Sequence, residues 1–432
     1  MESVWEKRDA WRYGAAALLI GGWAIPAAAA DLGGDCCADL EERVAELEVT
    51  TARKGNRKVS LTVSGWVNEN ILWFDDGLET NTYVGTNPVE QSRFRFVGEA
   101  RVAPDVSAGY VLELGVYGAN STTWNQSTPD GTNSNLVSVR KSSWFLKSDT
   151  YGKVTVGQDS TATYHLLDDA DTTMTRNFYD GEGAPDYVRP FFVVTASGDR
   201  LGLKWSDILR GFNNSTPGDS GRRNIVRYDS PTFAGFSVAA SWGEDDVWDM
   251  ALVYTGQWQD FRATARAGYG NSTDGTSTPC HSGDQALDCE WWGVSGIIQH
   301  IPTGIYAFAG YGDQNDGSHN PAVDALLIDK DSRTWFVQGG IEQKWIPLGK
   351  TNFFGEYRRD EAGSNVSGGV LVTQRANVNF WAVGAAQNFE AAEATAYVVY
   401  QHVDGDVTLG TDTSATDLHS MQQLIAGLKI NF

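Results

Sequence analysis

The feature that most constrains the fold is a pattern of alternating apolar and polar residues that recurs about sixteen times between residue 58 and the C-terminus. A period of two is typical of a β-strand with one apolar face and one wet face. The connections alternate between short turns, such as "APD", "QD" and "IPTG", and long loops rich in Asn, Asp, Ser, Thr and Gly. This arrangement, with an even strand count, is typical of a transmembrane β-barrel, in which each tilted strand needs ~9–11 residues. The predicted strands are 58–74, 91–103, 107–119, 136–148, 152–158, 222–230, 235–243, 247–258, 261–270, 290–300, 303–312, 332–345, 350–360, 373–387, 393–404 and 420–432.

Arginines occupy one face of several of these strands. In "FRATARAGY" Arg262 and Arg266 share a face, and in "SRFRFVGEARV" Arg93, Arg95 and Arg101 do the same. A soluble sandwich would also alternate, but arginines along a buried face are costly in a packed core and cost little in a water-filled lumen. We therefore predict an all-β fold, a 16-stranded antiparallel transmembrane β-barrel over residues 58–432 with a wet interior. The last strand, "MQQLIAGLKINF", must then pair with the first, because lipid tolerates no open sheet edge.

The first 57 residues have a different character. Residues 1–30 are predicted to be a signal peptide, because an apolar stretch ends in small residues, "IPAAAA". The flank before that stretch has no net positive charge, so a retained anchor is the alternative. Residues 31–57 place Leu40, Val44, Leu47 and Thr51 at heptad spacing, which predicts a short periplasmic helical, coiled-coil-like segment. One copy is too short to be stable alone, so the segment is either a trimer stalk or a short solvated helix.

Charge and cysteines narrow the class of partner. A net charge of −22 argues against nucleic acid or acidic lipid as a partner. Beyond the signal peptide no run of ~18 apolar residues predicts a transmembrane helix. Cys280 and Cys289 bracket the polar stretch "CHSGDQALDC" and are predicted to form a disulfide across one exposed loop. No Cys/His spacing suggests zinc, and we expect neither a metal nor a cofactor.

One connection, residues 159–221, is too long for an ordinary loop and calls for a functional explanation. In its first part, residues 159–188, its acidic residues are opposed by a single arginine, Arg176. Such a segment is expected to fold into the lumen and narrow it, so that its acids face the arginines of the wall across the constriction. A disordered surface loop is the other interpretation, and the spacing of "DDAD" is not that of an EF-hand. The acids considered are Asp168, Asp169, Asp171, Asp180, Glu182 and Asp186.

Several motifs resemble those of the general porins of Gram-negative outer membranes, among them "YDSPTFAGF", "SRFRFVGEARV", "KVTVGQ" and the terminal Phe432. The segment "CCADLEERVAELE" followed by "RKGNRKVSLTVSG" is similar to the porins of alphaproteobacteria. The resemblance implies a sixteen-stranded barrel, a homotrimer, and a third loop folded inward as the constriction. It makes the six acids the candidate constriction loop and Arg93, Arg95, Arg101 and Arg227 the basic wall, to which the alternation adds Arg262 and Arg266. It also makes Phe432 the residue read by the assembly machinery.

The function expected from these observations is passive diffusion of small hydrophilic solutes and ions through an outer-membrane channel. The net charge of −22 predicts a preference for cations, although acids in the outer loops could instead bind divalent cations that bridge lipopolysaccharide, and the arginine wall acts in the opposite direction. The alternatives are a substrate-specific porin with Trp66 in a binding track, and a barrel that tethers the cell wall by contact of residues 31–57 with peptidoglycan. A barrel enzyme is not expected, because neither G-x-S-x-G nor H-E-x-x-H occurs.

Overall fold

The computed structural model describes residues 59–131, 136–181, 183–209, 216–243, 246–273, 289–317, 321–367 and 369–432. The signal peptide at 1–30 and the helical segment at 31–57 lie outside these ranges and stay predictions. Within the described residues no helix is long and apolar enough to cross a membrane.

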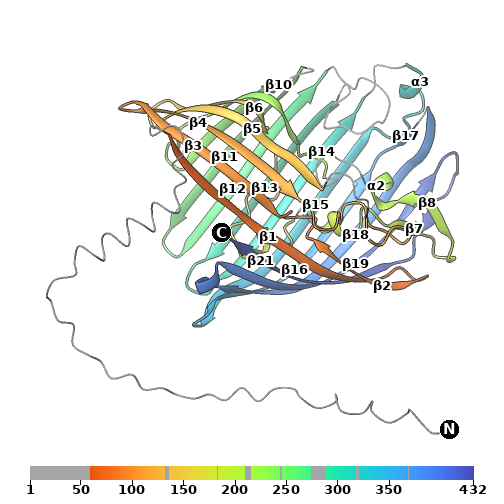
Figure 1. Cartoon of the computed structure of the whole chain (residues 1–432). Helices are drawn as coiled ribbons and strands as arrows, with labels where there is room; N and C mark the ends of the chain where they lie inside the picture. The colour runs from red at the N-terminus through yellow and green to blue at the C-terminus, as the bar shows by residue number, and fades with distance from the viewer. Residues whose placement is uncertain are drawn as a thin grey trace, which may run out of the picture. The chain divides into compact units, whose positions relative to one another are not determined.

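Sixteen long antiparallel strands in the described ranges form one closed sheet (Figure 1). Each strand pairs with its neighbour in sequence, and the first pairs with the last, with Trp66 opposite Asn431 and Ile71 opposite Ala426. Every predicted strand overlaps one of them, so the prediction of a sixteen-stranded antiparallel barrel is confirmed. The strands are β1 (Ser60–Asp75), β3 (Arg93–Ala103), β4 (Val106–Val116), β5 (Val137–Ser148), β6 (Gly152–Ser160), β9 (Arg222–Asp229), β10 (Phe236–Gly243), β11 (Val247–Trp258), β12 (Phe261–Ser272), β13 (Cys289–His300), β14 (Ile305–Asp316), β15 (Asp331–Ile346), β16 (Gly349–Ala362), β18 (Val370–Phe389), β19 (Ala394–Leu409) and β21 (Met421–Asn431).

Smaller elements occupy the connections. Strands β2 (Thr80–Thr86), β17 (Asn365–Ser367) and β20 (Thr416–Asp417) extend the barrel wall beside β1, β18 and β19. A separate two-stranded ribbon consists of β7 (Phe192–Val194) and β8 (Arg200–Lys204), followed by the short helix α2 (Trp205–Ile208). The other short helices are the 3₁₀ turns η1 (Met174–Asn177), η2 (Ala184–Tyr187) and η4 (Glu390–Ala392), and α3 (Pro321–Asp324). None of these elements follows from a period of two.

Cross-strand aromatic pairs mark the outer surface of the barrel. A tryptophan on one strand contacts a tyrosine on the next in four successive hairpins: Trp248–Tyr269, Trp292–Tyr311, Trp335–Tyr357 and Trp381–Tyr400, with ring centroids 5.2–5.6 Å apart. A second set lies near the short turns and includes Phe236–Tyr254 and Trp345–Phe353. Aromatic girdles of this kind flank the apolar band of transmembrane barrels, because amphipathic rings prefer the membrane–water interface.

The C-terminal residue completes the closure of the sheet. The backbone N–H of Phe432 donates to Gly65 O and the N–H of Gly65 donates to Phe432 O, both at 3.0 Å. The Phe432 ring lies 5.4 Å from the Phe94 ring, on the outer face. A side chain at Gly65 would overlap the Arg93 carbonyl oxygen, so the close approach at this seam requires glycine.

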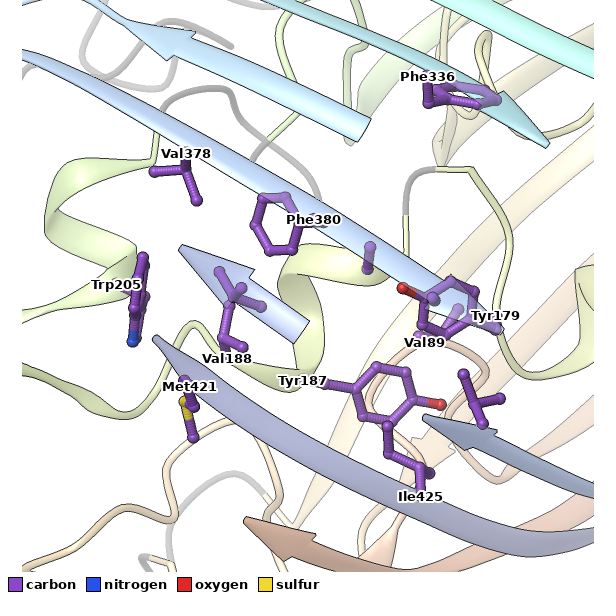
Figure 2. Close-up of a cluster of buried hydrophobic side chains, with 14 of the residues drawn as sticks. Val89, Tyr179, Tyr187, Val188, Trp205, Phe336, Val378, Phe380, Met421 and Ile425 are labelled. Carbon is purple, nitrogen blue, oxygen red and sulfur yellow. The ribbon is translucent and has the colours of Figure 1, made fainter. Parts of the chain in front are cut away.

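The connection between β6 and β9 is described at residues 161–181, 183–209 and 216–221, which pack largely against the inner face of the barrel, and we call these residues the inserted loop. It forms a hydrophobic core against the inner face of β13–β21, seen in Figure 2 where Tyr179, Tyr187 and Trp205 of the loop lie beside Phe380 and Ile425 of the wall. Burial of each such side chain contributes roughly 1.5–3 kcal/mol, so together they hold the loop firmly. The large loop side chains that are at most 1% exposed are Leu166, Leu167, Phe178, Tyr179, Tyr187, Val188, Phe191, Val193, Trp205 and Ile208.

Hydrogen bonds add specific attachments to this core. The Tyr179 hydroxyl donates to Gln401 Oε1 at 2.5 Å, and Arg358 Nη1 donates to the Gly181 carbonyl at 2.9 Å. At the beginning of the loop Asp249 accepts from the backbone and hydroxyl of Thr163, at 2.8 and 2.6 Å. The loop is therefore bonded to both halves of the wall, while its apolar side chains fill one half of the lumen.

Candidate functional site

The half of the lumen that the apolar side chains of the loop leave open is a cavity of about 470 Å³. Its lining comes from β1, β3–β6 and β9–β12 on the wall and from the first part of the inserted loop. Among its described lining residues, eight are basic and four are acidic, an excess of four positive charges. The basic residues are Arg93, Arg95, Arg140, Lys141, Arg176, Arg222, Arg227 and Arg266, and the acidic ones are Glu90, Glu113, Asp169 and Asp229.

A second cavity of about 450 Å³ continues this path toward the short-turn end of the barrel. The two cavities share Arg95, Lys141, Arg227 and Asp229, and the second adds Lys153 and Asp159 among others. Two of these cations are neutralised locally, since Lys141 Nζ lies 2.7 Å from Asp159 Oδ1 and Arg227 Nη2 lies 2.7 Å from Asp229 Oδ1. The positive lining therefore extends along the lumen beyond the inserted loop.

Three arginines share one carboxylate on the wall. Glu113 lies 2.5 Å from Arg95, 2.9 Å from Arg140 and 3.6 Å from Arg93, and it is 1% exposed. Arg140 reaches the lumen because of a β-bulge, since Glu113 pairs with Lys141 but Leu114 pairs with Val139. The bulge breaks the alternation, and it lets Arg140 and Lys141, which are adjacent in the chain, both point inward.

Arg222 is a further positive group on β9. Its guanidinium lies over the Tyr164 ring, 5.0 Å from the centroid, and donates a short hydrogen bond to the Tyr164 hydroxyl. Within the ranges that the structure describes, no carboxylate lies within ion-pair distance of Arg222. A tyrosine hydroxyl and a π-face leave its charge in place, so Arg222 contributes a full positive charge to the cavity.

Arg176 of η1 gathers the acids of the loop around itself. It lies 2.7 Å from Asp169, 2.8 Å from Asp180, 3.2 Å from Glu90 and 3.4 Å from Asp168. Burial raises the pKa of Asp168 to about 7 and also raises that of Asp180, whereas Arg176 acts in the opposite direction on both. Burial would also raise the pKa of Glu90, but the nearby cations Arg93, Lys429 and Arg176 lower it to about 2.

The predicted constriction acids are mostly directed away from the open cavity. Asp168, Asp171 and Asp180 are at most 6% exposed, and Asp171 accepts hydrogen bonds from Thr173 and Thr175 of the loop itself. Asp186 lies beside a separate cavity of about 430 Å³, 3.4 Å from Arg189. Asp169 lines the open cavity and is shared between Arg176 and Arg266, at 2.7 and 3.0 Å. Glu182 lies outside the described residues.

The predicted basic residues divide into two groups. Arg93, Arg95, Arg227 and Arg266 line the open cavity. Arg101 is exposed near the short-turn end of β3, and Arg262 points inward elsewhere on β12, where it donates to Gln299 Oε1 at 2.6 Å. Arg140, Lys141 and Arg222 are lining residues that the sequence argument missed. The segments "VRKSS" and "GRRN" each contain two adjacent cations, and this pairing is the sequence signal that could have identified Arg140, Lys141 and Arg222.

Three other sequence predictions concern an aromatic residue, a disulfide and a metal site. Trp66 is covered by cations, with Arg93 and Lys429 at 4.3 and 4.2 Å from its ring centroid, so its face is not open to a solute. Cys289 is buried at the start of β13, but Cys280 lies outside the described residues, so their pairing stays a prediction. Within the described ranges no group of three or more His, Cys, Asp or Glu side chains is arranged to hold a metal ion.

A closed sixteen-stranded barrel with aromatic girdles outside, and with a charged cavity beside an inserted loop inside, defines a transmembrane β-barrel channel of the outer-membrane class. The chain matches the Gram-negative porin family over residues 14–426, and it belongs to that family. Its location is accordingly the outer membrane. No curated protein sequence matches the chain.

Solved structures share the fold at low sequence identity. The anion-selective porin from Comamonas acidovorans is 14% identical, with a TM-score of 0.58, over 87% of this chain and 100% of that chain. OmpT of Vibrio cholerae is 14% identical, with a TM-score of 0.53, over 88% and 99% of the two chains. OmpF of Salmonella typhi is 13% identical, with a TM-score of 0.52, again over 88% and 99%.

Proposed function

We propose that this porin forms a water-filled channel for passive diffusion of small hydrophilic solutes and that its pore prefers anions. The observation that carries the preference is the excess of four positive charges among the described lining residues of the cavity beside the inserted loop. At ~10 Å in water one charge contributes about 0.4 kcal/mol, so four contribute about 1.6 kcal/mol, or roughly tenfold in local anion concentration at low salt. The Comamonas acidovorans barrel is an anion-selective porin, so this fold is compatible with that preference.

The competing proposal is the cation preference expected from the net charge of −22. It would require an acidic constriction, yet three of the predicted acids are buried around Arg176 or within the loop. Many other acids lie on the outward face beyond the aromatic girdle, among them Asp313, Glu361 and Asp404, whose cross-strand partners Trp292, Arg333 and Asn379 face outward. We assign these outer acids to lipopolysaccharide contacts through divalent cations and not to selectivity.

The reversal potential in planar bilayers decides between the two preferences. The refolded protein is inserted between 0.1 M and 1 M KCl, and the potential at zero current is measured for single insertions. A sign that corresponds to chloride permeating faster supports the proposal. A sign that corresponds to potassium would overturn the anion preference and restore the acidic constriction. An absence of stepwise openings would overturn the channel itself.

We also propose a homotrimer whose interface includes β21, β1 and β3–β6. Tyr110 lies opposite Trp144 here, but the described residues of these strands contain no tryptophan–tyrosine ring contact like those of β11–β19, and their outward residues are mainly Val, Leu and Ile. Glu69 of β1 faces outward here, half-buried, and accepts from Thr86 and Ser92 at 2.8 and 3.3 Å. A carboxylate is costly against lipid, so cover by a second copy is favourable. Native mass spectrometry in detergent tests this, since a mass of one chain would contradict it.

The N-terminal predictions complete this proposal. We propose that residues 1–30 direct export and that residues 31–57 contact peptidoglycan from the periplasmic side. Retention of the protein on purified sacculi after detergent extraction, compared between the full mature chain and a variant that lacks residues 31–57, tests the contact. Equal retention of the two would contradict it.

A further inference from the structure

A cluster of guanidinium groups in the open cavity provides more than a diffuse positive field. Arg95 on β3, Arg140 on β5 and Arg222 on β9 reach the same cavity from three different strands. Arg140 lies close enough to Arg222 to interact with it electrostatically. Arg93, Arg95 and Arg140 share the single carboxylate of Glu113, and Arg222 contacts the neutral Tyr164 hydroxyl. Arg93 also lies 2.8 Å from Glu90, so the cluster holds four guanidinium groups against two carboxylates.

The remaining charge matches an anion with two negative groups better than a monovalent one. A monoanion leaves half of this excess of two charges in place, whereas a dianion compensates both guanidinium charges at once. Guanidinium groups bind carboxylate and phosphate oxygens through two parallel N–H donors, which gives directional binding that chloride does not share. A cavity of about 470 Å³ has room for such an ion and several waters, since one water occupies roughly 30 Å³.

Resting on the proposed function, we propose that Arg95, Arg140 and Arg222 form a binding station for small dianions whose charges are on carboxylate or phosphate oxygens. A solute held there occupies the path of the current. The channel is therefore saturable for dianions and close to ohmic for chloride. The station takes its specificity from charge number and guanidinium geometry, because Trp66, the aromatic residue considered for a binding track, is covered by Arg93 and Lys429.

Block of the chloride current tests the station. Single channels are recorded in 0.1 M KCl at pH 8 while dipotassium succinate, potassium butyrate or potassium phosphate is added at constant ionic strength. Succinate and butyrate have the same number of carbons and differ in one carboxylate. We expect saturable block by succinate in the millimolar range and at least fivefold weaker block by butyrate. If phosphate blocks as strongly as succinate, the station binds compact oxyanions. If phosphate blocks more weakly than succinate, the station binds dicarboxylates whose charges are spaced apart.

Two variants test whether the block by succinate depends on Arg222. Arg222→Gln removes the charge that no described carboxylate pairs, and it should weaken succinate block at least fivefold. Arg262→Gln is the matched control, because Arg262 also points into the lumen but does not line this cavity. Each recording reports only inserted, folded channels, so a lower yield of a variant does not affect the result. Channels without saturable block, or equal block in R222Q and R262Q, would overturn the station and leave the porin function standing, whereas an absence of channels would overturn both.

Discussion

Arg176 is predicted to be the residue that keeps the acidic part of the inserted loop in place, and replacement by Gln tests this. Loss of one partner from a buried ion pair lowers the free energy of unfolding by about 3–5 kcal/mol. Three of the acids keep a second partner, since Asp169 lies 3.0 Å from Arg266, Glu90 lies 2.8 Å from Arg93 and Asp168 Oδ2 lies 2.6 Å from His165 Nδ1. Asp168, whose pKa is about 7, takes up a proton near neutral pH at little cost. The expected destabilisation is therefore near the lower limit, about 3 kcal/mol.

Two measurements test Arg176→Gln: hydrogen exchange reports the mobility of the loop, and the reversal potential reports the charge of the cavity. The aromatic core around Phe178 and Tyr187 is unchanged, so the loop stays in the barrel while the 165–180 segment loosens. Hydrogen exchange should show faster exchange in 165–180 and unchanged protection in β13–β16. At pH 6, where Asp168 is protonated in both proteins, the charge excess falls by one, which at ~10 Å in water corresponds to about a fourfold lower ratio of chloride to potassium permeability, because the two ions respond in opposite directions.

The matched control for Arg176→Gln is Arg262→Gln, which removes a lumen-facing arginine that does not contact the loop acids. R262Q should keep the wild-type exchange in 165–180 and the wild-type permeability ratio. If R176Q behaves as R262Q does in both measurements, then the loop acids do not depend on Arg176 for their position, and its assignment as their anchor is wrong.

Three further predictions concern pH, close packing and assembly. Burial raises the pKa of Asp168 to about 7, so the loop loses stability as pH rises through 7. Ionisation of Asp168 should lower the ratio of chloride to potassium permeability about fourfold between pH 6 and 8.5, and a flat titration of the reversal potential would contradict this. Gly312→Val would place Cβ in overlap with the Pro217 carbonyl oxygen and should cost about 1–3 kcal/mol in thermal unfolding, whereas Gly339→Val, whose nearest contact is 3.9 Å away, should cost little. Phe432→Ala loses one aromatic contact with Phe94 and should lower refolded stability by only about 0.5–1.5 kcal/mol, yet it should strongly reduce the heat-modifiable barrel recovered from cell membranes; equal recovery would contradict a role as assembly signal.

The strands were predictable because the sorting of side chains is local. Successive residues of a barrel strand face lipid and lumen in turn, so the sequence of every strand alternates between apolar and polar residues. On β12 the alternation placed Arg262 and Arg266 inward, as the structure does. The strand ends were less accurate on the loop side, where β18 and β19 continue to Val370 and Leu409, beyond the predicted 373 and 404. Their polar extensions are held by cross-strand backbone pairing, which leaves no apolar pattern in the sequence.

The pore lining was only partly predictable, because it depends on contacts between distant segments. Counting charges in the inserted loop suggests an acidic surface, but Asp168 and Asp180 turn inward around Arg176, where burial and the single cation stabilise them together. On the wall, a regular strand would point only one of the neighbours Arg140 and Lys141 into the lumen. The bulge in β5 lets both side chains point inward. A bulge and a folded loop are tertiary features, so neither has a reliable signal in one sequence.

The contrast between the net charge of −22 and the positive cavity follows from where charges lie relative to the solute path. Ions screen exposed charges beyond a Debye length of about 10 Å at 0.1 M salt. Asp313, Glu361 and Asp404 face away from the lumen, so their field at the cavity is weak. Arg95 and Arg222 border the cavity itself, where a permeating ion passes within a few ångström of them and little water or salt intervenes. Selectivity is thus set by the small group of charges around the cavity, and the charge of the whole chain describes mainly its outer surface.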